Sequence, residues 1–376
     1  MSNLNSSISC IIITRYPLKY KITGGKINVS TYSISKIYAT DKKKNRAVDS
    51  LLHQEGINRD QNLDYTCGIF DETDNLVGTG SCFKSSLRCL AVDHNHQGEG
   101  LMNKLVTHLM SFQFQRGNSH IFVYTKVKSA KFFQDLGFTE IARVADKLVF
   151  LENESSGFSD YLSQLTKSEQ HYQRVAGVVI NANPFSLGHQ YLVRKACEEN
   201  DLVHLFIVSQ DSSLFPFSVR ERLVKEGTAQ FDNIIYHETG SYMISSSTFP
   251  SYFLKDDELV IKTQASLDIQ LFIKIAQTLG INSRYVGEEP FSQVTGIYNE
   301  VMKTDLSKAN IDCHIVPRLA VKDNVVSASK IRQAIKDSDL EAVRPMVPQS
   351  TFNFLETDEG KQIIERIQQS QHVIHY

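Results

Sequence analysis

The sequence predicts an α/β fold made of two domains, the second of which is built on a parallel sheet. Its 376 residues exceed the roughly 100–200 that a single domain usually holds. A polar, serine-rich stretch at 152–174 separates two segments that each contain strand and helix patterns. In the second segment these patterns alternate, which is typical of a parallel sheet covered on both faces. We therefore expect domains at 1–155 and 175–376, joined by a linker at 156–174.

Composition and charge exclude several classes of protein. Hydrophobic residues make up 41% of the chain and charged residues 22%, as in proteins with real cores. The net charge of −2 indicates neither nucleic-acid binding nor an anionic membrane. The apolar run "ISCIIIT" at 8–14 is far shorter than the ~20 residues that a spanning helix needs, and it lacks the features of a signal peptide. The six cysteines have no metal-ligand spacing, so a reduced, cytoplasmic protein is expected.

The first segment alternates short strand patterns with two helical ones. In chain order we expect strands at 65–71, 76–83 and 86–93, a helix at 101–113, a strand at 120–126, a helix at 129–136 and a strand at 138–144.

The second segment alternates more regularly. In chain order we expect a strand at 175–181, a helix at 187–199, a strand at 202–209, a helix near 218–229, a strand at 233–237, a helix near 267–279, strands at 284–287 and 312–316, and a helix at 328–337. Parallel sheets bind ligands beyond the carboxyl ends of their strands. The loops that follow these strands are therefore the places to look for a site.

The loop after the first of these strands carries unusual residues. In "VVINANPFSLGHQYLVRKA" (178–196) the apolar strand breaks into asparagines and a proline, and a helix begins near Leu187. The free N–H groups and the positive dipole end of that helix would face the crevice. Gly188 would let a ligand approach the backbone, and His189 would point toward bound negative charge. The alternative for His189 is a helix cap or a satisfied surface group.

A second stretch, "VVSASKIRQAIKD" (325–337), places polar side chains at another helix start. Ser327, Ser329 and Arg332 cluster there, and hydroxyls, free N–H groups and a guanidinium together suit a polyphosphate. Taken alone, serines before a helix are more often simple caps. Arg220 and Arg222, in "FPFSVRER", could hold acetate or a phosphate, although solvated helix charges are the simpler interpretation.

These two stretches resemble known motifs. "SLGH" (186–189) resembles the T/H-x-G-H signature of the nucleotidylyltransferase superfamily, and "VSASKIR" (326–332) its late I-S-S-T-x-I-R motif. More narrowly, "NANPFSLGH", "FPFSVRERLVKEG" and "VGEEPFSQVTGIYNEVMK" resemble the citrate (pro-3S)-lyase ligase family. Ser186 replaces the first Thr/His, which puts any role for a second histidine in doubt. The resemblance implies a Rossmann-like second domain.

The resemblance also implies which residues form the site. The catalytic residues would be His189, Ser186 and Arg332. The ATP-binding residues would be Asn181, Asn183, Pro184, Phe185, Gly188, His189, Gly287, Glu289, Ser327, Ser329 and Arg332. Gly287, Glu288 and Glu289 follow a strand and would line the adenosine site, and a simple turn is the alternative interpretation of them.

The first segment has a motif of its own. In "AVDHNHQGEGLMNKLVTHL" (91–109) a strand ends in a glycine-containing loop that opens onto a helix, a turn whose N–H groups can hold a pyrophosphate. With "SAKFFQDLGFTEIA" (129–142) it resembles the GNAT acetyltransferases, whose fold is a mixed sheet and which bind coenzyme A at this loop. The residues implied in binding a coenzyme-A-like group are Val92, Gln97, Gly98 and Gly100. Met102 departs from the motif, and a domain that keeps the fold without activity is the alternative.

Together the resemblances imply a ligase. ATP and acetate would form acetyl-adenylate with Mg²⁺ bound to the phosphates, and the acetyl group would pass to a thiol on the citrate lyase acyl-carrier subunit. That thiol belongs to a phosphoribosyl-dephospho-coenzyme-A group, and AMP and pyrophosphate would be released. No metal site made by the protein alone is expected. The alternatives are a nucleotidylyltransferase acting on a phosphate acceptor, an acetyl-CoA-dependent protein acetyltransferase with a nucleotide-sensing domain, and a non-catalytic binding module.

Overall fold

The computed structural model of the chain describes residues 32–60, 62–209, 213–243, 257–288, 293–321, 324–370 and 373. The early apolar run and Glu289, both considered above, lie outside these residues. The structure divides into two compact units between Ser119 and His120, and each is described by itself. None of the described helices combines the length and the apolarity that crossing a membrane would require.

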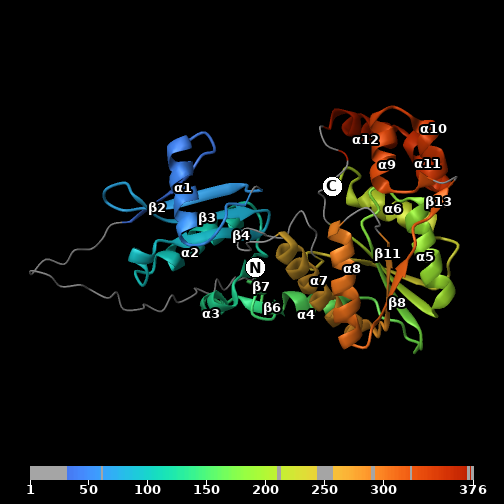
Figure 1. The fold of residues 1–376 in the computed structure, drawn as a ribbon, viewed down its shortest axis with the longest axis horizontal. Helices are drawn as coiled ribbons and strands as arrows, with labels where there is room; N and C mark the ends of the chain where they lie inside the picture. Colours follow the sequence, from blue (N-terminus) through green and yellow to red (C-terminus); the bar gives the residue numbers. More distant parts are fainter. Residues whose placement is uncertain are drawn as a thin grey trace, which may run out of the picture. The chain divides into compact units, whose positions relative to one another are not determined.

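The described part of the first unit is an antiparallel sheet with helices packed on it (Figure 1). Its strands, in spatial order, are β1 (Ser33–Lys36), β2 (Tyr65–Phe70), β3 (Leu76–Phe83) and β4 (Ser86–Val92). Its helical segments are α1 (Lys42–Gln54), the 3-10 turn η1 (His94–His96) and α2 (Leu101–Gln115). The predicted strands and the predicted helix of this segment are confirmed; β1 and α1 had not been predicted.

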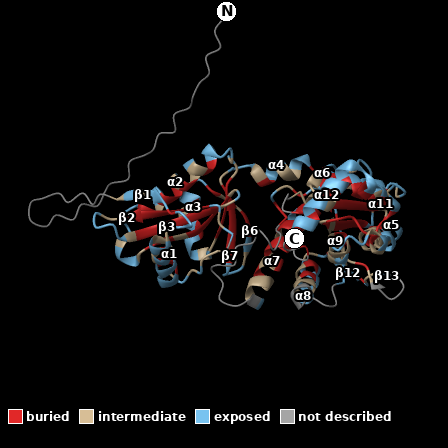
Figure 2. Ribbon diagram, turned by 90° about the horizontal axis from the view of Figure 1, so that it is seen from above, coloured by how far each residue is buried: buried red, intermediate tan, exposed pale blue. Residues whose placement is uncertain are grey.

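Gly80 explains how closely α2 packs on β3. An added Cβ at this position would lie 2.8 Å from Leu109 Cδ1 and 3.1 Å from Leu105 Cδ2, and both leucines are fully buried. The glycine therefore lets the apolar side of α2 approach the sheet directly, and this contact forms the interior of the unit. Figure 2 shows the buried residues concentrated along the strands.

The second unit opens with a small antiparallel group of strands. In spatial order these are β5 (Phe122–Thr125), β7 (Leu148–Glu152) and β6 (Thr139–Val144), accompanied by α3 (Val127–Asp135). Helix α4 (Gly157–Gln164) follows, inside the stretch expected to be a linker. The backbone N–H of Phe158 donates to the buried Glu152 carboxylate at 2.8 Å, and Tyr161 donates to the Glu238 carbonyl at 3.1 Å. Part of the stretch expected to be a linker is therefore a helix that these hydrogen bonds hold in place, although its composition is polar.

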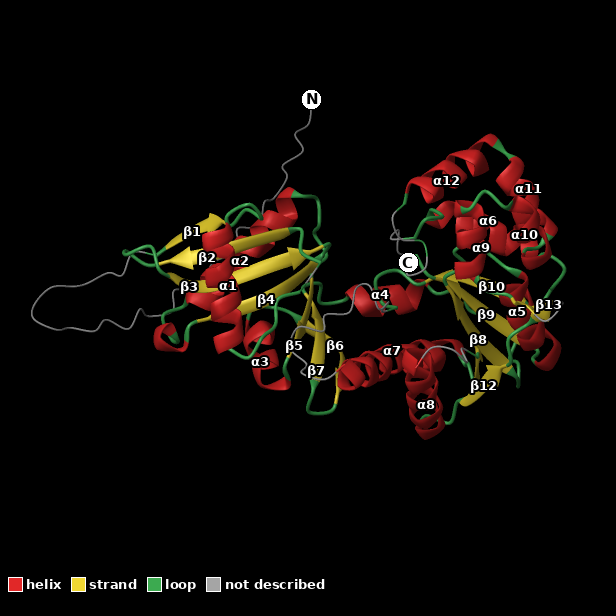
Figure 3. Ribbon diagram, turned by 45° about the horizontal axis from the view of Figure 1, so that its top comes forward, coloured by secondary structure: helices red, strands yellow, loops and turns green. Residues whose placement is uncertain are grey.

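The rest of the second unit is built on a five-stranded parallel sheet, as predicted (Figure 3). Its strands, in spatial order, are β10 (Ile234–Glu238), β9 (Leu202–Ile207), β8 (Val175–Ile180), β11 (Ser283–Gly287) and β12 (Asp312–Val316). The chain runs outward from β8 to β10 and then returns to β11 on the other side of β8. The strand order therefore reverses between β8 and β11, and a crevice forms at their carboxyl ends.

Helices cover both faces of the parallel sheet (Figure 1). They are α5 (Leu187–Glu199) on one face and α7 (Asp257–Leu279) with α8 (Gln293–Lys308) on the other. Gly177 lets α7 approach, because an added Cβ there would lie 2.7 Å from the Phe272 ring. The predicted helix near 267–279 is confirmed, but it begins earlier, at Asp257; α8 had not been predicted.

The C-terminal part of the chain is mostly helical. It contains the hairpin of β13 (Ala320–Val321) and β14 (Asn324–Val325), then α9 (Ala328–Lys336), α10 (Leu340–Val343), the turn η2 (Arg344–Met346), α11 (Gln349–Glu356) and α12 (Asp358–Gln369). Helix α11 packs on α6 (Phe217–Gly227), and α12 packs on α9. These contacts hold the start of α9 near the crevice of the sheet.

Candidate active site

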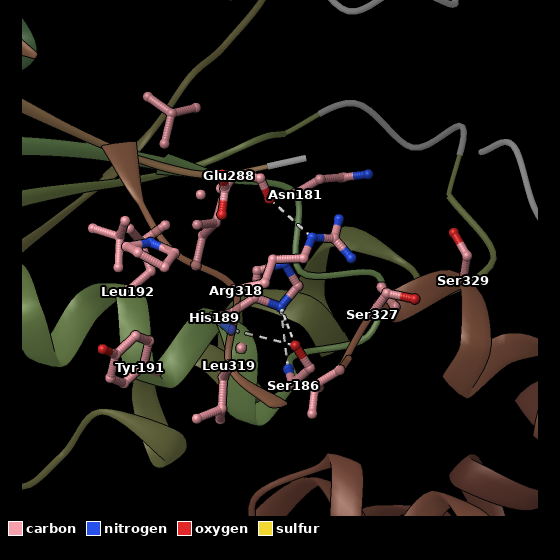
Figure 4. Close-up of a pocket in the computed structure, with 18 residues that line it drawn as sticks. Asn181, Ser186, His189, Tyr191, Leu192, Glu288, Arg318, Leu319, Ser327 and Ser329 are labelled. Carbon is pink, nitrogen blue, oxygen red and sulfur yellow. Dashed lines mark hydrogen bonds between the residues drawn. The ribbon is translucent and has the colours of Figure 1, made fainter. Parts of the chain in front are cut away.

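A pocket of about 310 Å³ opens at the carboxyl ends of β8, β11 and β12 (Figure 4). Its lining comes from three parts of the chain that are far apart in sequence. The lining residues are Val179, Ile180, Asn181, Ser186, Gly188, His189, Tyr191, Leu192, Gly287, Glu288, Val316, Pro317, Arg318, Leu319, Val326, Ser327, Ala328 and Ser329. The histidine loop and the 325–337 stretch, which the resemblance implies both bind ATP, therefore meet at one pocket.

Ser186 and His189 form the start of α5 together. Ser186 is the N-cap, and its Oγ accepts from the His189 backbone N–H at 3.3 Å. The His189 ring bonds back to the cap residue through Nδ1, which is 3.2 Å from the Ser186 backbone nitrogen and 2.9 Å from its Oγ. This is a capping box in which a histidine stands where Glu or Gln is usual. The alternative interpretation of His189 as part of a helix cap is thus confirmed, and the same ring also lines the pocket.

The contacts of His189 define its tautomer. A backbone N–H can only donate, so Nδ1 presents its lone pair to Ser186 and the ring proton lies on Nε2. Burial lowers the pKa of His189 to about 4, with further lowering by the positive charges of Arg318 and Arg332. At neutral pH the residue is therefore an uncharged imidazole with one N–H to donate.

Arg220 supports the loop from behind. It is fully buried, and its guanidinium donates to the carbonyl oxygens of Phe215 (3.0 Å), Asn181 (2.9 Å) and Val208 (2.6 Å). It also donates to Asn181 Oδ1 at 3.1 Å, which orients a side chain of the pocket. Arg220 is thus neither a solvated charge nor a lining residue, and both readings of it were wrong. Charge-assisted bonds to several carbonyls make it an internal tie between loops.

Arg222 lies on the surface of α6, where it pairs with Glu359 at 2.6 Å and is 46% exposed. The interpretation of Arg222 as a solvated helix charge is confirmed. It offers a control position for any test of arginines in the pocket.

Arg332 also lies behind the loop. It is 3% exposed, and its guanidinium donates to the carbonyls of Asn183 (2.5 Å) and Val373 (2.6 Å). Its third contact is with Ser329 Oγ at 3.4 Å. These bonds tie α9 to the β8–α5 loop, and Arg332 is not among the lining residues.

The start of α9 forms the opposite wall of the pocket. Ser327 is the N-cap, its Oγ accepting from the Lys330 backbone N–H at 3.2 Å. Figure 4 shows Ser327 and Ser329 on one side of the pocket, across from His189. The first N–H groups of α5 and α9 therefore both lie at the pocket, and such helix starts favour bound anions.

Arg318 lines the pocket although the sequence had not singled it out as a site residue. Glu288, which the sequence offered as a candidate together with Gly287, lines it as well. Arg318 comes two residues after the end of β12, and its Nε donates to the Glu288 carbonyl at 2.9 Å. Desolvation lowers the pKa of Arg318. The available signal was its place after a strand of the parallel sheet, where βα loops carry function.

The predicted site residues fall into three groups. Those that line the pocket are Asn181, Ser186, Gly188, His189, Gly287, Ser327 and Ser329. Those behind it are Asn183, Pro184, Phe185 and Arg332. Glu289 lies outside the described residues. Asn183 is 2% exposed and accepts from the Phe215 N–H at 3.1 Å, while Phe185 is fully buried, so these two residues shape the loop.

The glycine loop of the first unit opens onto α2, as its sequence predicted. Gly98 and Gly100 have φ of +85° and +75°, in the left-handed region that side chains disfavour, and Gly100 caps α2. Gln97 is exposed beside them, whereas Val92 ends β4 and is 8% exposed. Among the described residues, no group of three or more His, Cys, Asp or Glu side chains could hold a metal ion.

The chain is an α/β protein whose first unit carries a glycine loop before a helix and whose second unit carries a pocket at the carboxyl ends of a parallel sheet. The family model "Citrate lyase ligase C-terminal domain" matches residues 175–355, and "Acetyltransferase (GNAT) family" matches residues 31–138. Citrate (pro-3S)-lyase ligase of Klebsiella pneumoniae is 35% identical over 84% of this chain and 93% of its own length. The protein of that name from Escherichia coli K12 is 32% identical, over 86% and 93%. The chain belongs to the citrate (pro-3S)-lyase ligase family and is an enzyme.

Similarity to solved structures is lower. Thermotoga maritima TmcAL, bound with alpha-thio ATP, covers 50% of this chain and 56% of its own at 13% identity, with a TM-score of 0.34. Likeness of this size carries no weight for function.

Proposed function

We propose that this enzyme activates citrate lyase in the cytoplasm by acetylating the prosthetic-group thiol of its acyl-carrier subunit, with ATP and acetate as substrates. The observation that carries the proposal is the meeting of two helix starts around a neutral His189 at the switch point of a parallel sheet. Such a site suits a polyphosphate. The names of relatives that match most of the chain supply the citrate lyase partner.

The first step would be adenylation of acetate. A carboxylate oxygen attacks the α-phosphorus, the bond from that phosphorus to the bridging oxygen breaks, and pyrophosphate leaves with the electron pair. The product is acetyl-adenylate. Charge grows on the phosphoryl oxygens, so the enzyme acts by positioning and by donating hydrogen bonds.

The pocket residues have separable roles in this step. The Nε2–H group of His189 donates a hydrogen bond to a phosphate oxygen. Ser186 holds the ring through its hydrogen bonds to Nδ1. Ser327 and Ser329, with the first N–H groups of α9, would receive the pyrophosphate. Mg²⁺ would enter on the nucleotide and neutralise part of its charge, and the two hydroxyls are oxygen donors of the kind that Mg²⁺ accepts. Arg332 contributes by holding the loop that carries Asn183.

The second step would be transfer to the carrier. The thiol sulfur attacks the carbonyl carbon of acetyl-adenylate, the thiol proton is lost, and AMP leaves with the electron pair of the broken carbon–oxygen bond. In this proposal the domain at 1–155 binds the phosphoribosyl-dephospho-coenzyme-A group at Gln97, Gly98 and Gly100. The domain at 175–376 carries adenylation, with 156–174 between them.

The deciding experiment measures AMP from ATP and acetate, with and without deacetylated citrate lyase. We expect AMP to form in proportion to the thioester made on the acyl-carrier subunit, and lyase activity to return with it. ATP–pyrophosphate exchange that ignores acetate but needs a phosphomonoester acceptor would instead indicate a nucleotidylyltransferase. Acetyl transfer from acetyl-CoA without ATP cleavage would indicate a protein acetyltransferase. Either result would overturn the proposal.

A further inference from the structure

The pocket contains one cationic side chain that no motif singles out. Among the described residues that line it, eighteen in all, Arg318 is the only lysine or arginine. The arginine of the late motif, Arg332, lies behind the loop with two of its nitrogens bonded to backbone carbonyls. The positive charge inside the pocket therefore comes from a different residue than the motif suggests.

Arg318 is held in a defined orientation. Its Nε donates to the Glu288 carbonyl at 2.9 Å, which ties the loop after β12 to the loop after β11. Pro317, immediately before it, fixes one backbone torsion. Figure 4 shows its guanidinium beside the His189 ring in the centre of the pocket. A planar guanidinium oriented in advance loses little freedom on binding an anion.

The surroundings of Arg318 favour an anion. The facing groups are an uncharged imidazole and the starts of α5 and α9, whose N–H groups carry partial positive charge. The Glu288 carboxylate, also at the pocket, acts on Arg318 with its negative charge, but it belongs to an exposed residue and desolvation of Arg318 outweighs it. A partly desolvated cation among such neighbours is stabilised most by a ligand of opposite charge.

We infer that Arg318 binds the phosphate oxygens of ATP and is the arginine that the reaction uses, and that Arg332 is a positioning residue for the 181–186 loop. The inference rests on the proposed function for the identity of the anion. A nucleoside triphosphate has the charge and the oxygens that a guanidinium recognises in pairs.

The test compares three variants in ATP binding without acetate, followed by calorimetry. Arg318→Gln should weaken ATP binding about 10- to 100-fold, the usual effect of losing hydrogen bonds to a charged group. Arg318→Lys should recover part of the loss, because the charge remains and the paired donors do not. Arg222→Gln, which removes an exposed arginine of the same chain, should bind as the wild type does.

A second readout separates a role in the pocket from a role in folding. The Arg318 charge is one of the causes that lower the pKa of His189, so its removal should raise that pKa in an NMR titration of the ring. Arg318→Gln should leave the melting temperature nearly unchanged, whereas Arg332→Gln should lower it clearly. If a folded Arg318→Gln protein binds ATP as tightly as the wild type does, and the wild type shows acetate-dependent ATP–pyrophosphate exchange, the inference is overturned and the proposed function stands. If Arg318→Gln weakens ATP binding but ATP–pyrophosphate exchange by the wild type does not respond to acetate, the proposed function is overturned and the inference stands.

Discussion

For His189 the sequence presented two roles as rivals, a helix cap and a donor to the ligand. The ring accepts from its own helix cap through Nδ1, and this contact leaves the Nε2 proton as the group available to a ligand. Because an imidazole has two distinct nitrogens, one side chain can form the cap and also serve as the donor of the proposed mechanism.

Replacing His189 by alanine should reduce turnover about 10²- to 10³-fold, the usual effect of removing one donor that acts in the transition state. The lost cap contact should cost only about 1 kcal/mol of stability. Initial rates of AMP formation measure the first effect, and urea unfolding measures the second. His94→Ala, at a ring that is 66% exposed, serves as the control. A folded His189→Ala protein with wild-type turnover would remove this residue from the mechanism.

The pKa of His189 also makes a prediction about pH. Because it is lowered to about 4, the ring stays neutral and donating as the pH falls from 8 to 5. We expect no loss of ATP–pyrophosphate exchange centred near pH 6.5. A titration of activity at that pH which disappears in the His189→Asn variant would contradict the neutral assignment.

At the scale of elements, the pocket is formed at the starts of two helices, α5 and α9. Ser327 caps α9 and lines the pocket, so Ser327→Ala should lose about 1 kcal/mol of stability and also weaken ATP binding. Thr357 is the matched control: its Oγ1 caps α12 by accepting from the Gly360 N–H at 3.1 Å, and it does not line the pocket. Thr357→Ala should lose similar stability and keep ATP affinity. Equal ATP affinity in both variants would show that Ser327 is a cap only.

The glycine loop of the first unit allows a comparable test. Replacing Gly98 and Gly100 by valine should raise KM for the carrier protein and spare acetate-dependent ATP–pyrophosphate exchange. Both positions have positive φ, so each change also strains the backbone by roughly 1–2 kcal/mol. Gly117→Val controls for this strain, because φ is +81° there and a Cβ would meet nothing within 4 Å. A matching rise in KM for Gly117→Val would attribute the effect to strain.

At the scale of the molecule, a buried histidine pair links stability to pH. His204 Nδ1 lies 2.8 Å from His237 Nε2 on adjacent strands, and the two residues are 1% and 7% exposed. Burial lowers the pKa of both to about 4. Between pH 6.5 and 4 the unfolded chain binds protons that the folded protein refuses, so stability falls as the pH falls.

The measurement is the free energy of unfolding from pH 7 to 4.5. Each proton taken up on unfolding contributes a slope of about 1.4 kcal/mol per pH unit. In the His204→Leu/His237→Leu double variant, leucines replace both members of the pair within the sheet core, and the slope should be smaller. An unchanged slope would assign the acid sensitivity to other groups.

The sequence by itself determined most of the elements between 65 and 337 and their order. Strand and helix periodicities from 65 to 144 and from 175 to 337 were strong, since each element buries one regular face or run. The start of α7 and all of α8 were not predicted. Residues 257–266 mix charged and apolar side chains, and the residues of α8 whose burial is described are mostly exposed or intermediate. Their packing against each other, which local sequence does not contain, holds them in place.

Only the tertiary structure decided which polar groups meet. Three arginines look alike in the sequence, yet Arg220 and Arg332 became buried ties between loops and Arg318 reached the pocket. The physical reason is that burying a guanidinium requires several carbonyl partners, and the fold alone brings those partners from distant residues to one point.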